Sequence, residues 1–320
     1  MAKVVVTGIT GFIGSHLAKR LLELDHIVYG IIRASASRSL APIEDILDSV
    51  ILLTADITDF MSISNALKTA SPDYVCHLAA LSPVRLSFER PFDFEKMNYL
   101  GTMNIVHAMI DLPDYRKRKL IAASTAEVYG IHTDKRPLSE DSRLIPSSPY
   151  SVSKVAADMY LRMAAKVYDL DIVILRPTNT FGRKFERNFL VEYLVTSMLQ
   201  GNKVYVGAAD SIREYLYIDD HVNGYIQAMK YGQKGQVYNL GGQATTNKDL
   251  AKKIAQKIGF DESRIVFGVY PPGYPLRPIK SDQPYIMLDS TKAKNELKWV
   301  PKVSIDEGLN RAINYWRSHL

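Results

Sequence analysis

A tyrosine and a lysine four residues apart, Tyr150 and Lys154, form the pair with the clearest chemistry in this sequence. Pro149, directly before the tyrosine, suits the start of a helix, so both side chains lie one turn apart on the same helix face. An ammonium group beside a phenol favours the phenolate, and we therefore expect the pKa of Tyr150 to be lowered towards neutrality. Such a phenol can exchange a proton with a substrate hydroxyl.

A hydroxyl and a carboxylate, Thr125 and Glu127, lie two residues apart directly after the apolar run 119–123. In open α/β sheets the reactive groups gather where the strands end at their carboxyl side. We therefore expect Thr125 to bind a substrate oxygen and Glu127 to act as a second base. The alternative for Glu127 is a solvated side chain in a turn at the end of a strand.

Three glycines spaced three residues apart, Gly8, Gly11 and Gly14, stand where an apolar run changes into a helical pattern. The first allows a tight turn, the second lets backbone amides approach a pyrophosphate, and the third lets the helix pack on the strand. The pyrophosphate then lies at the positive end of the helix. This turn predicts a bound dinucleotide, with Phe12 and Ile13 among its contacts. Together with the tyrosine–lysine pair, it predicts hydride exchange with a nicotinamide.

Residues after the next three apolar runs are predicted to complete the dinucleotide site. Arg33 stands near the position where an acidic residue would hold the ribose 2′-hydroxyl of NAD, and an arginine there favours the 2′-phosphate of NADP. A solvated loop arginine is the alternative, which leaves NAD open. Asp56 is placed to contact the adenine together with Ile57. Small residues after the fourth run form a close-fitting wall for the cofactor: Leu78, Ala79 and Ala80.

The elements that position these residues are buried strands that alternate with amphipathic helices. The apolar runs are continuous rather than alternating, which indicates strands covered on both faces and hence parallel βαβ winding. We predict an α/β fold, with a Rossmann-type doubly wound parallel sheet over residues 1–178 and a smaller C-terminal α/β substrate lobe over 179–320. The apolar run 235–240 predicts that the chain returns to the first sheet around residues 218–242.

Composition narrows the class of protein. The 320 residues are 47% hydrophobic and 23% charged, as in soluble globular proteins, and no apolar run is long enough to cross a bilayer. The single cysteine, Cys76, excludes an intrachain disulfide and favours the cytoplasm. No spacing of histidines, cysteines or carboxylates indicates a metal site. The net charge of +6 permits nucleic-acid binding without requiring it, and an anionic small molecule suits the scattered basic residues of the second half better: Arg183, Lys184, Arg213 and Arg277.

Three motifs together resemble those of the extended short-chain dehydrogenase/reductase family: Gly8-x-x-Gly11-x-x-Gly14, Ser124-Thr125-Ala126-Glu127-Val128-Tyr129-Gly130 and Tyr150-x-x-x-Lys154. The resemblance extends along essentially the whole chain. It implies an NAD(P)-dependent enzyme that modifies a nucleotide sugar. It also implies a homodimer or homotetramer, packed through the helix that bears the tyrosine and the helix near residues 94–110.

The same resemblance implies a substrate site in the second half of the chain. Arg213 begins a segment similar to the family's Arg-Asp-x-x-x-Val-x-Asp element, whose arginine grips the substrate diphosphate. Arg277 is similar to the second diphosphate arginine, and Asn179 and Asn188 match positions that contact the sugar nucleotide. Ser82, which follows the fourth apolar run, is expected either to line the sugar pocket or to cap its own loop.

Within the family, the closest likeness is to GDP-mannose 4,6-dehydratases, seen in Thr7–Gly11, Gly30–Arg33 and the Thr125-x-Glu127 pair. That likeness implies oxidation of the sugar at C4, loss of the C5 proton, departure of the C6 hydroxyl and return of hydride to C6. Glu127 would then be the C5 base, Tyr150 the proton acceptor at C4, and Thr125 its hydrogen-bonding helper.

Other activities remain open. Residues 12–17 are more similar to 4-epimerases, so an epimerase of the UDP-glucose and UDP-galactose type, which needs Tyr150 but not Glu127, is the main alternative. A glutamate at position 127 also occurs in related 4-keto-reductases and decarboxylases. A dinucleotide-sensing regulator is the non-enzymatic alternative, supported only by the basic composition. Such proteins often lose the tyrosine–lysine pair that this chain keeps.

Overall fold

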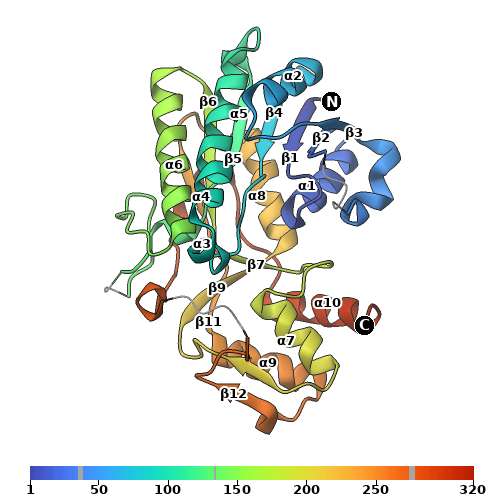
Figure 1. The fold of residues 1–320 in the computed structure, drawn as a ribbon, viewed down its shortest axis with the longest axis vertical. Coiled ribbons are helices and arrows are strands. Elements are labelled where there is room, and N and C mark those ends of the chain that lie inside the picture. Colours follow the sequence, from blue (N-terminus) through green and yellow to red (C-terminus); the bar gives the residue numbers. More distant parts are fainter. Residues whose placement is uncertain (35–38, 133–134, 274–277) are drawn as a thin grey trace.

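The computed structural model describes residues 1–34, 39–132, 135–273 and 278–320. The larger of its two lobes is built around a seven-stranded parallel sheet (Figure 1). The strands lie in the order β10-β6-β5-β4-β1-β2-β3. Their bounds are β1 (Lys3–Thr7), β2 (Ile27–Ile32), β3 (Ile51–Thr54), β4 (Tyr74–His77), β5 (Lys119–Ala123), β6 (Asp171–Pro177) and β10 (Val237–Leu240). The strand order reverses between β1 and β4, where doubly wound sheets leave a crevice for a ligand.

Helices cover both faces of this sheet, which explains why its strands read as continuous apolar runs. Val4 and Val6 of β1 belong to one core, whereas Val5 between them belongs to the other. The elements that close the first core are α1 (Phe12–Glu23) and α8 (Ile218–Tyr231), and those that close the second are α2 (Phe60–Ala70), α5 (Gly101–Ile110) and α6 (Pro149–Val167). The predicted Rossmann-type sheet is confirmed.

Short helical segments lie in the connections that follow the strands. The segments are η1 (Ala41–Ser49) after β2, then α3 (Leu86–Glu89), α4 (Pro91–Phe94) and η2 (Glu95–Leu100) between β4 and α5, then η3 (Tyr115–Lys117) before β5 and η4 (Ala126–Val128) after it. The last of these is the turn that holds Thr125 and Glu127 at the carboxyl edge of the sheet.

A smaller α/β lobe lies below the large sheet in Figure 1. It contains two small sheets, ordered β11-β9-β7 and β12-β8. Its strands are β7 (Asn179–Phe181), β8 (Val204–Val206), β9 (Ile212–Tyr217), β11 (Gln243–Thr246) and β12 (Ile265–Phe267), and its helices are α7 (Leu190–Leu199), α9 (Asn247–Ile258) and α10 (Ile305–Arg317). Short segments complete the chain: η5 (Glu262–Arg264), η6 (Ile279–Ser281) and η7 (Ala293–Leu297). The chain enters this lobe after β6, returns to the large sheet through α8 and β10, and then enters the lobe again.

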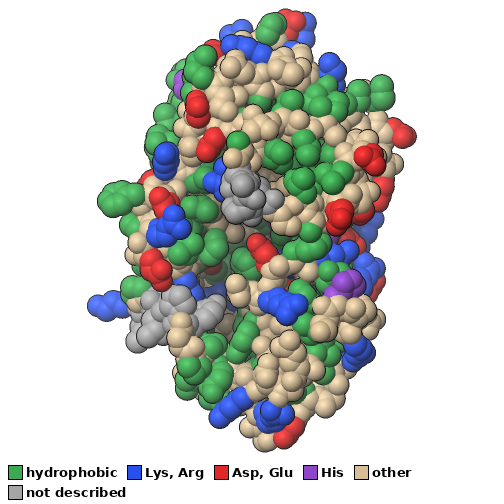
Figure 2. All heavy atoms as spheres, turned by 45° about the vertical axis from the view of Figure 1, so that its right-hand side comes forward, with side chains coloured by type: hydrophobic (Ala, Val, Ile, Leu, Met, Phe, Trp, Pro, Cys, Tyr) green, Lys and Arg blue, Asp and Glu red, His purple; other side chains and the backbone are tan. Residues whose placement is uncertain are grey.

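The helices in the described part of the chain include none that is long and apolar enough to span a membrane. On the face of the molecule in Figure 2, lysines and arginines are interspersed with aspartates and glutamates. The positive excess of the sequence is therefore not gathered into a single patch on that face.

Candidate active site

The glycine turn between β1 and α1 has the shape that a dinucleotide requires. Gly8 has a φ of +71°, which residues with a side chain rarely adopt. A Cβ on Gly14 would lie 2.2 Å from the carbonyl oxygen of Gly8, so only glycine lets α1 start this close to the strand. The cap residue Gly11 has no side chain that could bond to the start of α1. The N–H groups of Phe12 and Ile13, the first residues of this helix, are therefore left for an anion. These residues fit the pyrophosphate of a dinucleotide.

Thr7, at the end of β1, connects the loop after β4 to this turn through hydrogen bonds. Its hydroxyl oxygen accepts hydrogen bonds from the N–H groups of Leu78 and Ala79, both at 3.1 Å. A Cβ on Gly8 would lie only 3.0 Å from the Ala79 backbone. Ala80 is half-buried in the same loop. The predicted cofactor wall and the glycine turn therefore lie against each other.

The remaining predicted cofactor residues follow β2 and β3. Arg33 is exposed directly after β2. One carboxylate oxygen of Asp56 accepts hydrogen bonds from the N–H and the hydroxyl of Thr58, at 2.8 and 2.9 Å, so this side chain also shapes its own loop. Ile57 is buried and packs where a Cβ on Gly101 would otherwise lie. Of these three side chains, Arg33 is the cation, and it is exposed.

Tyr150 is buried near the start of α6 and does not have the lowered pKa that the sequence predicts. Its ring meets that of Phe94 edge to face, at 6.1 Å between centroids. Burial raises the pKa of Tyr150 to about 12, while a hydrogen bond with the Thr125 side chain opposes this rise and the charge of Glu127 adds to it. The prediction was wrong because the pattern Tyr-x-x-x-Lys does not show how little solvent reaches the phenol.

Lys154 is equally buried, and its ammonium group donates a hydrogen bond to the carbonyl oxygen of Ala123 at the end of β5. Burial lowers the pKa of Lys154 to about 8, and the nearby charge of Asp158 opposes the shift. The lysine is thus anchored to the edge of the sheet. In this arrangement the Thr125 hydroxyl, rather than the ammonium group, is the side chain that favours the phenolate of Tyr150.

Thr125 and Glu127 lie beside this phenol. The Thr125 hydroxyl oxygen accepts a hydrogen bond from the N–H of Glu127 at 3.2 Å, which starts the short turn η4. The Glu127 carboxylate is half-buried and accepts a hydrogen bond from Gln283 Nε2 at 3.0 Å. The structure therefore brings Thr125, Glu127 and Tyr150 together. It adds Gln283, which the sequence analysis missed because this glutamine belongs to no motif.

A buried ion pair supports the site and was also missed. Arg176 of β6 donates two hydrogen bonds to Asp158 of α6, at 3.0 and 2.8 Å, and neither side chain is exposed. Asp158 also accepts a hydrogen bond from the Ser124 hydroxyl at 2.7 Å, and Arg176 donates one to the Tyr129 hydroxyl at 3.0 Å. The network ties the helix that carries Tyr150 to the ends of β5 and β6.

The predicted substrate residues lie at the second lobe and the nearby loops. Asn179 is exposed at the start of β7, and its register partner on β9 is two residues from Arg213. Arg213 is 8% exposed, and its guanidinium donates to the carbonyl oxygen of Ile212 at 2.9 Å. Asn188 and Ser82 are exposed in loops. The second predicted arginine, at position 277, lies outside the described residues.

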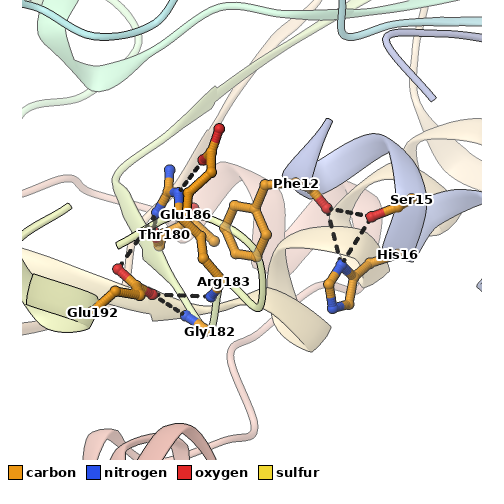
Figure 3. Close-up of polar contacts among 8 residues, drawn as sticks. All are labelled: Phe12, Ser15, His16, Thr180, Gly182, Arg183, Glu186 and Glu192. Atoms are coloured by element: carbon orange, nitrogen blue, oxygen red, sulfur yellow. Dashed lines mark hydrogen bonds and ion pairs between the residues drawn. The ribbon is translucent and has the colours of Figure 1, made fainter. Parts of the chain in front are cut away.

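Arg183, one of the basic residues that could meet an anionic ligand, is engaged within the protein (Figure 3). Its guanidinium lies 4.4 Å from the ring centroid of Phe12 and 3.4 Å from that of Phe189. It donates hydrogen bonds to Glu186 at 3.2 Å and to the Thr180 carbonyl oxygen at 2.7 Å. Aromatic and acidic neighbours therefore already contact this cation. Arg183 joins the second lobe to the glycine turn.

The burial of Glu214, next to Arg213, is expected to make the stability of the protein depend on pH. Burial raises the pKa of Glu214 to about 7, against hydrogen bonds from the N–H groups of Leu288 and Gly242. From about pH 4.5 to 7 the unfolded chain therefore releases a proton that the folded chain retains, and stability falls as pH rises. We expect the free energy of unfolding of Glu214→Gln to fall by up to about 3 kcal/mol less than that of the wild type over this pH range. Urea unfolding of the wild type and the variant at several pH values measures this difference. The same pH dependence in both proteins would contradict the prediction.

A dinucleotide turn, a doubly wound sheet and a buried tyrosine–lysine pair define the class of extended short-chain dehydrogenases/reductases. Residues 5–312 match the family described as GDP-mannose 4,6 dehydratase, and the chain belongs to this family. The predicted family and the predicted class of enzyme are confirmed.

Curated relatives are similar over nearly the whole chain. A probable dTDP-glucose 4,6-dehydratase of Sinorhizobium fredii is 30% identical, with 98% of this chain and 92% of the relative covered. A UDP-glucose 4-epimerase of Mycolicibacterium smegmatis is 31% identical, with 99% of both chains covered. The predicted dehydratase activity and its main alternative, the 4-epimerase activity, are therefore both represented among the relatives.

Solved structures of relatives divide in the same way. A UDP-glucose 4-epimerase of Thermotoga maritima with UDP-glucose has a TM-score of 0.86 and 30% identity, with 99% of both chains covered. A dTDP-glucose 4,6-dehydratase of Streptomyces venezuelae with NAD bound has a TM-score of 0.88 and 28% identity, with 98% of this chain and 97% of that chain covered. Fold similarity alone does not separate the two reactions. The distinction between them therefore has to come from the side chains of the site.

Proposed function

We propose that this chain is a nucleotide-sugar 4,6-dehydratase of the GDP-mannose type. The position of Glu127 supports this proposal best, because its carboxylate lies beside the hydrogen-bonded Thr125 and Tyr150. Reversible oxidation at C4 needs one proton acceptor, whereas elimination across C5 and C6 needs a second base. The family match and the dehydratases among the relatives support the same reaction.

The first step is oxidation at C4. A bound nicotinamide supplies the hydride acceptor and, in its oxidised form, a positive charge that favours a nearby phenolate. Tyr150 takes the proton of the C4 hydroxyl while hydride leaves C4, and the C4–O bond becomes a carbonyl. Thr125 holds the phenol in place through its hydrogen bond. Lys154, fixed to Ala123, carries a positive charge at the edge of the sheet near the cofactor crevice.

The second step is elimination of water. The C4 carbonyl acidifies the C5 proton, which Glu127 removes. The electrons of the C5–H bond form the C5–C6 double bond, and the C6–O bond breaks. Glu127 then passes its proton to the departing hydroxyl, which leaves as water. Hydride then returns to C6 and a proton returns to C5, which leaves a 4-keto-6-deoxy sugar.

The second candidate is a nucleotide-sugar 4-epimerase, favoured by the epimerases among the relatives. Incubation of the pure protein with GDP-mannose, followed by mass spectrometry, separates the two. A dehydratase gives a product lighter by one water, whereas an epimerase gives a product of unchanged mass. Absence of a dehydrated product from GDP-, UDP- and dTDP-hexoses would refute the proposal.

We propose NADP as the resident cofactor, because Arg33 is exposed at the end of β2, where a 2′-phosphate would lie. NAD is the alternative, since it is the dinucleotide named in the structures of relatives. Denaturing the purified protein and measuring the mass of the released dinucleotide decides between them.

We also propose a cytoplasmic enzyme, in keeping with the fully buried free thiol of Cys76.

We further propose that two or four copies associate through α6 and the segment before α5. Val152 and Met159 are 46% and 59% exposed on one side of α6, and Phe92 and Leu100 are exposed in the neighbouring segment. Apolar side chains grouped in this way are typical of an interface. We expect Met159→Glu to lower the mass measured by light scattering, whereas Met61→Glu, on the exposed side of α2, leaves it unchanged. Equal masses for both variants would contradict this interface.

A further inference from the structure

Gln283 occupies a buried position between the candidate base and the start of α6. Its side chain is fully buried. Its Nε2 donates one hydrogen bond to Glu127 Oε2 at 3.0 Å and another to Ser147 Oγ at 3.1 Å. Ser147 stands one residue before the N-cap of the helix that carries Tyr150. One amide group therefore contacts the candidate base and the entry to the helix of the candidate proton acceptor.

The orientation of this amide is set by its neighbours. Ser147 Oγ donates its own proton to the carbonyl oxygen of Ser281, at 3.2 Å, so it can only accept from Gln283. Turning the amide over would direct its oxygen at the carboxylate of Glu127, which is unfavourable. Both contacts therefore require the N–H groups of Gln283 to point towards the base.

This orientation of the amide leaves its oxygen without a hydrogen bond. The other amide atom of Gln283, Oε1, is buried and has no hydrogen-bond partner in the described part of the chain. A buried polar atom without a partner destabilises the folded state, and an apolar side chain of the same length would avoid this loss. A role confined to packing therefore does not account for an amide here.

The segment that carries Gln283 also reaches the second lobe. The carbonyl oxygen of Pro284 accepts a hydrogen bond from Ile212 N at 3.0 Å, and Ile286 N donates one to the Ile212 carbonyl oxygen at 3.1 Å. Ile212 begins β9 and directly precedes Arg213, the predicted diphosphate residue. Gln283 therefore connects the strand proposed to hold the substrate with the carboxylate proposed to remove its C5 proton.

We propose that Gln283 is a positioning residue that fixes the Glu127 carboxylate for the elimination step. This inference rests on the proposed function, because it gives Glu127 the role of C5 base. Gln283 keeps one carboxylate oxygen of Glu127 engaged, which leaves the other available to the substrate. We expect its effect to fall on the elimination far more than on the oxidation at C4, which depends on Tyr150.

The test is Gln283→Met, which preserves side-chain length and removes both the donors and the unpaired oxygen. With GDP-mannose in D2O, we expect deuterium incorporation at C5 to fall by about 10- to 100-fold, as for a displaced catalytic group. The rate of cofactor reduction in a single turnover should stay within about twofold of the wild-type rate, and the thermal midpoint should be unchanged or higher. Gln283→Glu, which places a second carboxylate beside Glu127, should lose exchange as well. Gln233→Met, at an exposed position, is the matched control.

The outcomes separate the inference from the proposed function. Exchange at the wild-type rate in Gln283→Met overturns the positioning role alone. Equal losses of cofactor reduction and exchange, together with a lower thermal midpoint, also overturn it, because they indicate a structural role. A wild-type protein that reduces its cofactor but exchanges no hydrogen at C5 does not carry out the elimination, which overturns both proposals.

Discussion

Replacing Tyr150 with phenylalanine is expected to lower turnover by about 10²- to 10⁴-fold, the range typical of a lost proton-transfer group. The ring keeps its edge-to-face contact with Phe94, so the fold should be preserved. The phenol oxygen, however, is the atom that takes the proton of the C4 hydroxyl. Stopped-flow absorbance of the reduced nicotinamide after mixing with GDP-mannose measures this first step directly.

Two variants serve as controls for this prediction. Tyr231→Phe removes a hydroxyl at the exposed end of α8 and should retain the wild-type rate. Thr125→Val keeps the shape of the side chain but removes its hydrogen bond to the phenol, so it should slow the same step by a smaller factor than Tyr150→Phe. A Tyr150→Phe protein that reduces its cofactor at the wild-type rate would assign the C4 proton to another group.

The large sheet was predictable because its signals are local. Each strand of a sheet covered on both faces is a short continuous apolar run, as β1 illustrates with Val4, Val5 and Val6 divided between two cores. The glycine turn is equally local, since Gly8 and Gly14 must approach each other over six residues of chain. The second lobe is less regular because its strands are short and belong to two separate sheets.

The residues at the edge of the sheet were predictable for a second reason. Parallel strands bring their carboxyl ends to one edge, so the residues after β5 and at the start of α6 had to meet. Gln283 could not be found in this way, because 156 residues separate it from Glu127 and no spacing rule connects them. The pair of Arg176 and Asp158 left a weak signal, namely an arginine at the end of an apolar strand. The pKa of Tyr150 depends on burial, which a motif does not reveal.

Replacing Glu127 with glutamine is expected to separate a dehydratase from an epimerase. Glutamine retains the shape of the side chain but cannot remove the C5 proton. In a dehydratase we expect the dehydrated product to form about 10²- to 10⁴-fold more slowly, while cofactor reduction continues. The 4-keto sugar and the reduced cofactor should therefore accumulate together in a single turnover. Mass spectrometry of the product and absorbance of the cofactor measure the two steps in one sample.

The control for this prediction is Glu89→Gln, an exposed position on α3, which should behave as the wild type. An epimerase needs a base only at O4, so Glu127→Gln would then retain full turnover with UDP-glucose and release no dehydrated product from any hexose. That result would leave Tyr150 as the proton acceptor and show that Glu127 takes no part in the reaction. Loss of cofactor reduction in Glu127→Gln would instead place the carboxylate in the first step, because its charge acts on the buried phenol of Tyr150. The three patterns differ in which step is lost, so one variant distinguishes the mechanisms that the family match and the fold leave open.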